Sequence, residues 1–195
     1  MLKQLGQICA KKWQRFTSAD RGVTAVEFVL VMPVIITIFA VAFETGMMFF
    51  TEMTLQFSVE DAARSIRTGA AQMGGLSQVD FKTKVCNSAG ALIDCQGKVT
   101  VYVRSDNDFA TLKSKLPPLV NIGPSTGPTT VVAPACYNPG APQKPAIIVA
   151  TYDWYFFGVG MNIFGNVAGN TARRLTAETV FLNQNYPGNS ATACP

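Results

Sequence analysis

A chain of 195 residues can hold one domain, or one small domain and a membrane segment. Only 14% of its residues are charged, against roughly 25% in typical soluble domains, and its mean hydropathy is positive. It has no histidine, which excludes the commonest general base, the usual catalytic triads and most zinc sites. The net charge of +4 is modest and no basic cluster follows Arg21, so no nucleic-acid-binding surface is predicted.

The first 21 residues are a basic leader without a lasting apolar period. Positive charge beside a hydrophobic run stays on the cytoplasmic side of a membrane. We therefore expect the N-terminus inside and the bulk of the chain outside. The basic residues of the leader are Lys3, Lys11, Lys12, Arg15 and Arg21.

A hydrophobic run follows from Phe28 to Phe50. A bilayer core needs roughly 20 apolar residues in a helix, so we predict a transmembrane helix over residues 23–51. Pro33 is tolerated in such a helix, with a kink or a loosened turn. Glu27 lies at the inner edge of the run, and we expect Glu44 near the outer interface, where its carboxylate reaches water.

Three interpretations of this run compete. Ala40-Val41-Ala42 has the small-residue pattern of a secretory cleavage site, but the charged region before it is unusually long and the apolar run continues beyond it to Phe50. A plain signal anchor explains the hydropathy. The third interpretation rests on Arg21-Gly22-Val23-Thr24-Ala25-Val26-Glu27-Phe28, which resembles the processing site of a type IV prepilin. Its Glu-Phe pair is similar to the Flp or Tad branch, whose TadE-like members carry a related opening.

The resemblance assigns a role to each residue at this boundary. Gly22 would be the last leader residue, and Val23 the new N-terminus after cleavage by the prepilin peptidase. Glu27 and Phe28 would be the fifth and sixth mature residues. A carboxylate inside a membrane is costly and usually has a partner. The Val23 ammonium, in the same chain or in a neighbouring subunit, would provide one for Glu27.

The helical pattern continues past the hydrophobic run. Leu55, Val59, Ala62 and Ile66 recur on one helix face, and Gly69 is a natural C-cap. We therefore expect one helix to about residue 68, about 70 Å long at about 1.5 Å per residue. Residues 60–69 also resemble the segment that follows the membrane helix in TadE-like proteins.

The rest of residues 52–195 is predicted to form an α+β domain. Ser77 and Asp80 have the spacing of a capping box before a short helix that runs to Cys86. A proline-rich stretch over residues 117–145 is predicted to be a long surface loop, either a contact surface or a tolerated insertion. Strands are expected at about residues 98–104, 146–157 and 173–183.

Four of the five cysteines follow the hydrophobic run, where an oxidising compartment would let them pair. Four cysteines allow three pairings. We favour Cys86–Cys95 and Cys136–Cys194, because the first pair closes a short local loop. Buried thiols are the alternative.

No catalytic or metal-binding constellation is predicted after Thr51. Asp106-Asn107-Asp108 lacks the glycine and the distal glutamate of an EF-hand, so a turn or a helix cap is the better interpretation. The aromatic cluster over residues 152–157 is interpreted as sheet core and subunit contact. No cofactor is expected.

Together these features predict an α+β, pilin-like protein: a cytoplasmic leader (residues 1–22), a transmembrane helix, and a periplasmic domain with a small antiparallel sheet. The resemblance implies a TadE-like minor pilin or pseudopilin, not an enzyme, that serves the assembly of adhesive Flp/Tad pili. Its partners would be the prepilin peptidase, the inner membrane, and other Tad pilins such as the major pilin and a TadF-like subunit. It would be anchored in the bacterial inner membrane and available for incorporation into an extracellular pilus. The alternative is a signal-anchored periplasmic binding domain with no filament role.

Overall fold

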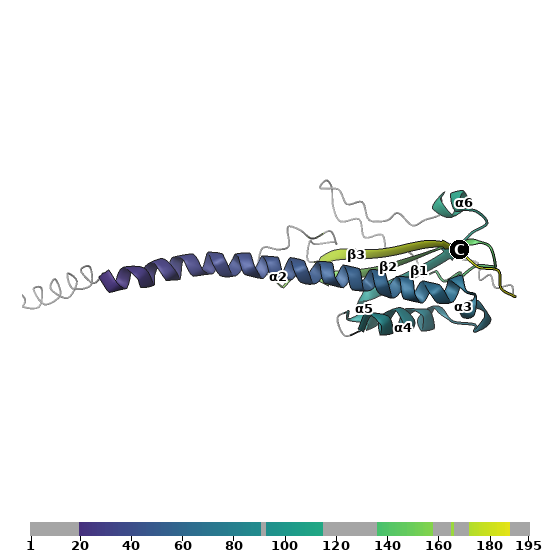
Figure 1. Cartoon of the computed structure of the whole chain (residues 1–195), viewed down its shortest axis with the longest axis horizontal. Coiled ribbons are helices and arrows are strands. Elements are labelled where there is room, and N and C mark those ends of the chain that lie inside the picture. Colours follow the sequence, from purple (N-terminus) through teal and green to yellow (C-terminus); the bar gives the residue numbers. More distant parts are fainter. Residues whose placement is uncertain (1–19, 91–92, 115–135, 158–164, 166–171, 188–195) are drawn as a thin grey trace, which may run out of the picture. The chain divides into compact units, whose positions relative to one another are not determined.

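The structure is a computed structural model that describes residues 20–90, 93–114, 136–157, 165 and 172–187 (Figure 1). The chain divides into two compact units, Met1–Phe43 and Glu44–Pro195. We call the first the N-terminal unit and the second the head. Helix α2 (Asp20–Arg67) contributes residues to both.

In the N-terminal unit, the side chains described along α2 are exposed on nearly every side. Phe39 and Phe43, for example, are 71% and 72% exposed. Pro33 lies inside the helix, where it has no N–H to donate. The Thr37 hydroxyl donates to the Pro33 carbonyl at 2.7 Å, so this polar side chain is satisfied within its own helix. Among the described residues, this is the one helix long and apolar enough to cross a bilayer. We call residues 25–43 the apolar stretch.

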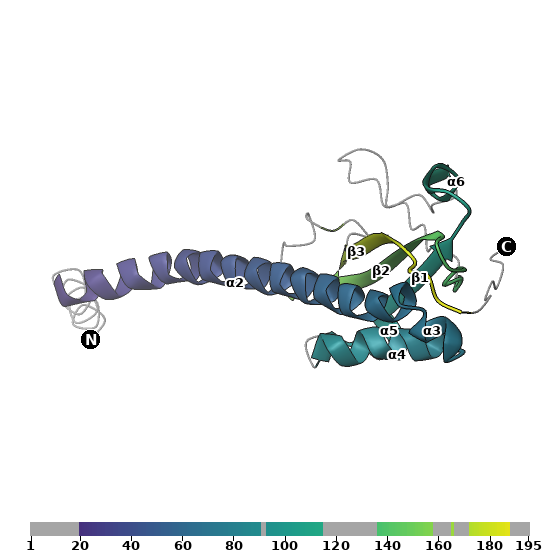
Figure 2. The ribbon, with the colours of Figure 1, turned by 45° about the vertical axis from the view of Figure 1, so that its right-hand side comes forward.

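The head consists of the end of α2, further short helices and three strands. Figure 2 shows α4 alongside the head part of α2, with α6 apart from both. In chain order the elements after α2 are α3 (Ala70–Met73), α4 (Gln78–Ala89), α5 (Cys95–Lys98), β1 (Val99–Ser105), α6 (Phe109–Ser114), β2 (Pro145–Tyr155) and β3 (Ala172–Leu182).

The three strands form one antiparallel sheet in the order β1-β2-β3. Alternation of apolar residues along β1 puts Val99, Val101 and Val103 on one face, where each is at most 2% exposed. Val101 lies opposite Ala150, and Ala150 lies opposite Ala177. The predicted α+β class, with a long N-terminal helix followed by a small antiparallel sheet, is confirmed.

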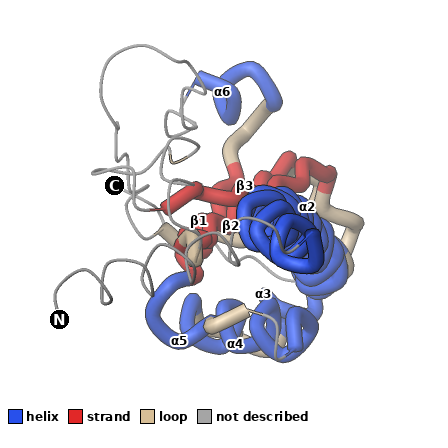
Figure 3. The backbone as a smooth tube through the Cα atoms, turned by 90° about the vertical axis from the view of Figure 1, so that its left-hand side faces the viewer, coloured by secondary structure: helices blue, strands red, loops and turns tan. Residues whose placement is uncertain are grey.

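The main core lies between this face of the sheet and helices α2 and α4 (Figure 3). The predicted inner face of α2 is confirmed, because Leu55, Val59, Ala62 and Ile66 are all 0% exposed. Each large apolar side chain buried in this way stabilises the fold by roughly 1.5–3 kcal/mol. Phe81, also 0% exposed, brings α4 into the same cluster.

Helix α4 begins with the predicted capping box. The Ser77 hydroxyl accepts from the backbone N–H of Asp80 at 3.2 Å, and the Asp80 carboxylate accepts from the Ser77 N–H at 3.1 Å. Two of the N–H groups at the start of the helix are thereby satisfied. Helix α6 is capped in a related way, since the Asp108 carboxylate accepts from the Thr111 N–H at 2.7 Å. The interpretation of residues 106–108 as a turn or helix cap is therefore confirmed.

The opposite face of the sheet has a smaller core, and part of the proline-rich stretch belongs to it. Residues 115–135 lie outside the described residues, but Cys136 is buried with Tyr102, Ile147 and Val149. In the last part of this stretch Cys136, Pro139 and Gly140 are therefore buried, whereas Gln143 is exposed. The reason lies at the outer edge of β1: the Val103 N–H donates to the Cys136 carbonyl, and the Val103 carbonyl accepts from Asn138, each at 2.9 Å. An exposed edge strand needs such partners, and this segment provides them.

The far end of α2 is held by the segment after β3. Gly69 follows the helix with φ of 81°, a left-handed conformation that suits glycine and confirms the predicted C-cap. A Cβ at this position would overlap the ring of Tyr186. The Gln184 N–H donates to the Arg67 carbonyl at 2.8 Å, which satisfies one of the last carbonyls of the helix.

Candidate functional site: the long helix and its two ends

The predicted processing residues lie at the amino end of α2. Helix α2 is described from Asp20 onward, so the Gly22–Val23 peptide bond lies within it. The helix expected from Val23 onward is observed, and it also includes Gly22.

Glu27 and Phe28 are both exposed, Phe28 by 60%. In α2, Val23 and Glu27 are four residues apart, so the Val23 backbone and the Glu27 side chain lie one turn apart on the same face. Among the described residues Glu27 has no ion-pair partner. A positive charge at the Val23 nitrogen would be close enough to interact with this carboxylate.

The second glutamate of the helix is placed differently from the expectation. Glu44 is only 8% exposed, and its carboxylate accepts from the backbone N–H of Phe157 at 2.6 Å. The expected contact with water is therefore wrong. The physical reason is that β2 ends at Tyr155, so the Phe157 N–H lies beyond the ladder and needs another acceptor. A partner 113 residues away is not visible in the local pattern.

The disulfide candidates have two outcomes. Cys86 and Cys95 are joined by a disulfide that links the last turn of α4 to the first residue of α5. Cys136 is also disulfide-bonded. Cys194, the partner favoured for it from the sequence, lies outside the described residues. The head is therefore cross-linked chemically, which is typical of proteins exposed to an oxidising compartment.

Within the described part of the chain, no group of three or more metal-ligating side chains comes together. The ion pairs of the head join neighbouring parts of the fold. Arg174 and Asp153 face each other across β3 and β2 with two bonds of 2.7 and 2.9 Å. The bonded carboxylate raises the pKa of Arg174 further above its ordinary value. These pairs hold strands together and do not converge on a cleft.

The arrangement is that of a long helix whose first part is apolar and whose second part packs against a small sheet. A protein-family comparison matches residues 22–64, and the description of that family is TadE-like protein. This segment is TadE-like. The TadE-like segment begins at the predicted last leader residue, Gly22, and ends at Arg64, just before α2 ends.

The match spans less than a quarter of the chain and includes both Glu27 and Glu44. The sheet of the head lies outside the TadE-like segment. No curated protein and no solved structure matches the chain. TadE-like proteins belong to Tad pilus systems.

Proposed function

We propose that the chain is a TadE-like minor pilin or pseudopilin, a membrane-anchored structural subunit for the assembly of Flp/Tad adhesive pili. The observation that carries this proposal is that the TadE-like segment, residues 22–64, lies entirely within one helix, α2, whose first part is apolar. A scaffold of this kind needs an anchor and an assembly surface, and it needs no catalytic residues.

The apolar stretch serves as the membrane anchor. Its 19 residues would span about 28 Å at about 1.5 Å per residue, close to the roughly 30 Å of a hydrocarbon core. The basic leader keeps the N-terminus in the cytoplasm, so the head is on the periplasmic side of the inner membrane. The Cys86–Cys95 disulfide is consistent with that side.

Gly22 is the last residue of the leader, and the prepilin peptidase cuts the chain before Val23. The new ammonium of Val23 lies one helical turn from Glu27 and can pair with it, or with Glu27 of a neighbouring pilin. Such a pair offsets part of the cost of burying a carboxylate in the membrane and sets the register of neighbouring subunits. The major pilin and a TadF-like subunit are the partners that we propose.

Mass spectrometry of the mature protein tests this proposal directly. The full chain would be expressed with and without a Tad-type prepilin peptidase, and the proposal requires an N-terminus at Val23 only when the peptidase is present. An uncut Met1 in its presence would indicate a plain signal anchor. A start at Phe43 would indicate an ordinary secretory signal, and either result would contradict the proposal.

A substitution at the cut site provides the matched control. Gly22→Ala should block cleavage while membrane insertion, measured by resistance to alkaline extraction, stays the same. Gly46→Ala is the comparison, because nothing lies within 4 Å of the space that its new methyl group would occupy. Efficient cleavage of Gly22→Ala would count against the proposed processing site.

A further inference from the structure

The end of the sheet at which α2 enters the head carries an exposed aromatic rim, formed by Tyr155 and Phe157. We propose that this rim rests on the membrane that holds the apolar stretch, with its aromatic rings at the boundary between headgroups and acyl chains. The proposal rests on the membrane anchoring proposed above. It adds a second contact with the lipid, made by the head itself.

The position of the rim follows from one hydrogen bond. Glu44 is the first residue of the head and is joined by its peptide bond to Phe43, the last residue of the apolar stretch. Its carboxylate accepts the Phe157 N–H at 2.6 Å. The backbone of Phe157 is therefore hydrogen-bonded to the residue that directly follows the apolar stretch. This holds whatever the orientation of the N-terminal unit.

The side chains of the rim are unusually exposed for aromatic residues. Phe157 is 88% exposed and Tyr155 is 49% exposed, whereas Trp154, which precedes them in the chain, is only 9% exposed. The ring of Trp154 contacts that of Phe157 edge-on, with ring centroids 6.3 Å apart, so it supports Phe157 from the core side. One side of the Phe157 ring is therefore supported by Trp154, and most of its surface is exposed. On α2, Phe50 is also 53% exposed, less than two turns after Glu44.

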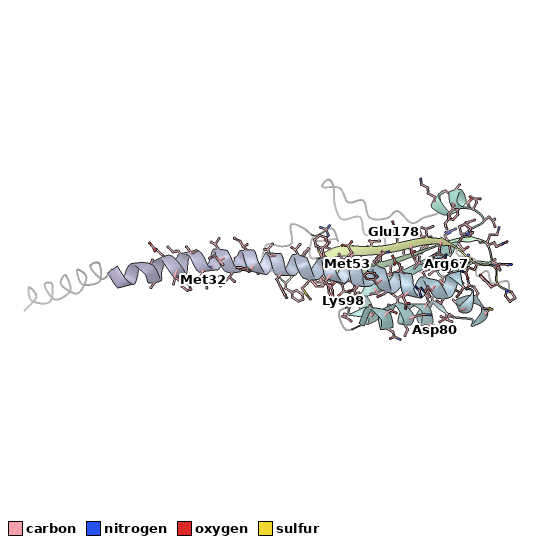
Figure 4. The ribbon with its side chains drawn as sticks, in the orientation of Figure 1. Met32, Met53, Arg67, Asp80, Lys98 and Glu178 are labelled. Carbon is pink, nitrogen blue, oxygen red and sulfur yellow. A yellow bond between two sulfur atoms is a disulfide. The ribbon has the colours of Figure 1, made fainter. Side chains whose placement is uncertain are left out.

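One cationic side chain lies against this rim, and another is close to it along β3. The Lys98 ammonium lies over the Tyr155 ring, 5.4 Å from its centroid, and Figure 4 places Lys98 at the opposite end of the head from Arg67. Arg173 is adjacent to the first residue of β3, which pairs with Tyr155. Aromatic rings beside long cationic side chains are typical of protein surfaces at the membrane–water interface, where the ring enters the apolar boundary and the cation reaches the headgroups.

The charges near the rim nearly cancel. Lys98 forms an ion pair with Asp94 at 3.1 Å, and Arg174 is paired with Asp153. Attraction to anionic lipids is therefore weak, and the aromatic rings provide most of the contact. The rim should therefore contact neutral and anionic lipid surfaces equally well.

Site-specific photocrosslinking tests the proposal on the full chain reconstituted in phospholipid vesicles. Phe157 would be replaced by p-benzoylphenylalanine, which keeps an aromatic ring at this position and reacts with what it touches. Leu182, which is 50% exposed at the other end of β3, is the matched control. Val34, 60% exposed in the apolar stretch, is the control for insertion.

We expect lipid adducts by mass spectrometry at positions 157 and 34, with at least a tenfold lower yield at position 182. The yield at position 157 should be equal in vesicles of phosphatidylcholine and in vesicles that also contain phosphatidylglycerol. A lipid adduct at position 34 but none at position 157, or a protein adduct at position 157, would overturn the rim proposal and leave the anchor intact. No lipid adduct at position 34 would overturn the anchor, and the rim proposal with it.

Discussion

The side-chain amide of Gln56 pairs with both backbone polar groups of Glu178. Its Nε2 donates to the Glu178 carbonyl at 3.1 Å, and its Oε1 accepts from the Glu178 N–H at 3.2 Å. Glu178 lies in β3, which is an edge strand, and Figure 4 labels it beside α2. The amide of Gln56 therefore takes the place of a neighbouring strand at this point, and it joins the helix to the sheet through hydrogen bonds as well as packing.

Replacing Gln56 with alanine should lower the free energy of unfolding by about 1 kcal/mol, because the two hydrogen bonds with Glu178 and an exposed one to the Glu60 carboxylate are lost. Urea unfolding of the full chain in detergent micelles, followed by circular dichroism, measures this change. Gln184→Ala is the matched control, since the Gln184 side chain is exposed and only its backbone N–H bonds to α2. Equal stability of the two variants would show that the Gln56–Glu178 pairing does not stabilise the head.

The capping box of α4 should make the stability of the head sensitive to acid. Hydrogen bonds from Ser77 lower the pKa of Asp80 from its ordinary value. Because the folded pKa is lowered, the contribution of Asp80 is present above its unfolded pKa of about 4 and is lost as the pH falls through the folded value. Ser77→Ala should therefore destabilise the head near neutral pH and do so by less near pH 2, where only the bond from the Asp80 N–H to the Ser77 hydroxyl remains to be lost.

Urea midpoints at pH 7 and near pH 2 measure this difference. Thr83→Ala in the same helix is the control, because the Thr83 hydroxyl donates to the Val79 carbonyl and its loss leaves the cap unchanged. A Ser77→Ala cost that did not shrink with acid would contradict the assigned role of the Asp80 carboxylate.

Tyr137 should make the head lose stability in alkali. Its hydroxyl is buried without a hydrogen-bond partner among the described residues, and its ring lies 5.7 Å from that of Phe81. Burial raises the pKa of Tyr137 to about 12, and the nearby Asp80 adds to the shift. Since the folded pKa is raised, the neutral form stabilises the fold below about pH 10, and this stability is lost as the pH rises from 10 towards 12.

Tyr137→Phe removes the ionisable group and an unsatisfied hydroxyl together. At pH 8 we expect the variant to be as stable as the native chain or more stable. Between pH 8 and pH 11 the free energy of unfolding should fall by about 1 kcal/mol less in the variant than in the native chain, after allowance for the partial exposure of Tyr137. Urea unfolding at both pH values measures the decline. Parallel declines in the two proteins would show that Tyr137 does not ionise in this range.

Glu27→Gln should separate processing from assembly. The variant keeps Gly22 and Val23, so we expect cleavage to proceed, but the amide cannot form an ion pair with the new ammonium. Incorporation into sheared pili, measured by immunoblot, should fall by at least tenfold. Glu52→Gln on the same helix is the control and should assemble normally. Native levels of Glu27→Gln in the pili would argue against a charge pair at this site.

The sequence predicts those parts of the fold that depend on near neighbours. The apolar face through Leu55 and Ile66 and the cap at Ser77 follow from spacing over a few residues, and the alternating valines of β1 indicate a strand. What it could not predict depends on residues far away in the chain. The burial of Glu44 requires Phe157, and the place of Cys136 against β1 requires an edge strand with unpaired backbone groups.

The two hydrogen bonds at the ends of α2 have a mechanical consequence. Glu44 holds the helix where it enters the head, and Arg67 holds it at the far end through Gln184. Within the head, α2 and β3 run alongside each other (Figure 1). A pull transmitted through the backbone at Phe43 therefore acts lengthwise along the interface between helix and sheet. Such a shear load is shared by all the contacts at once, so the head resists tension as one body and does not open one contact at a time.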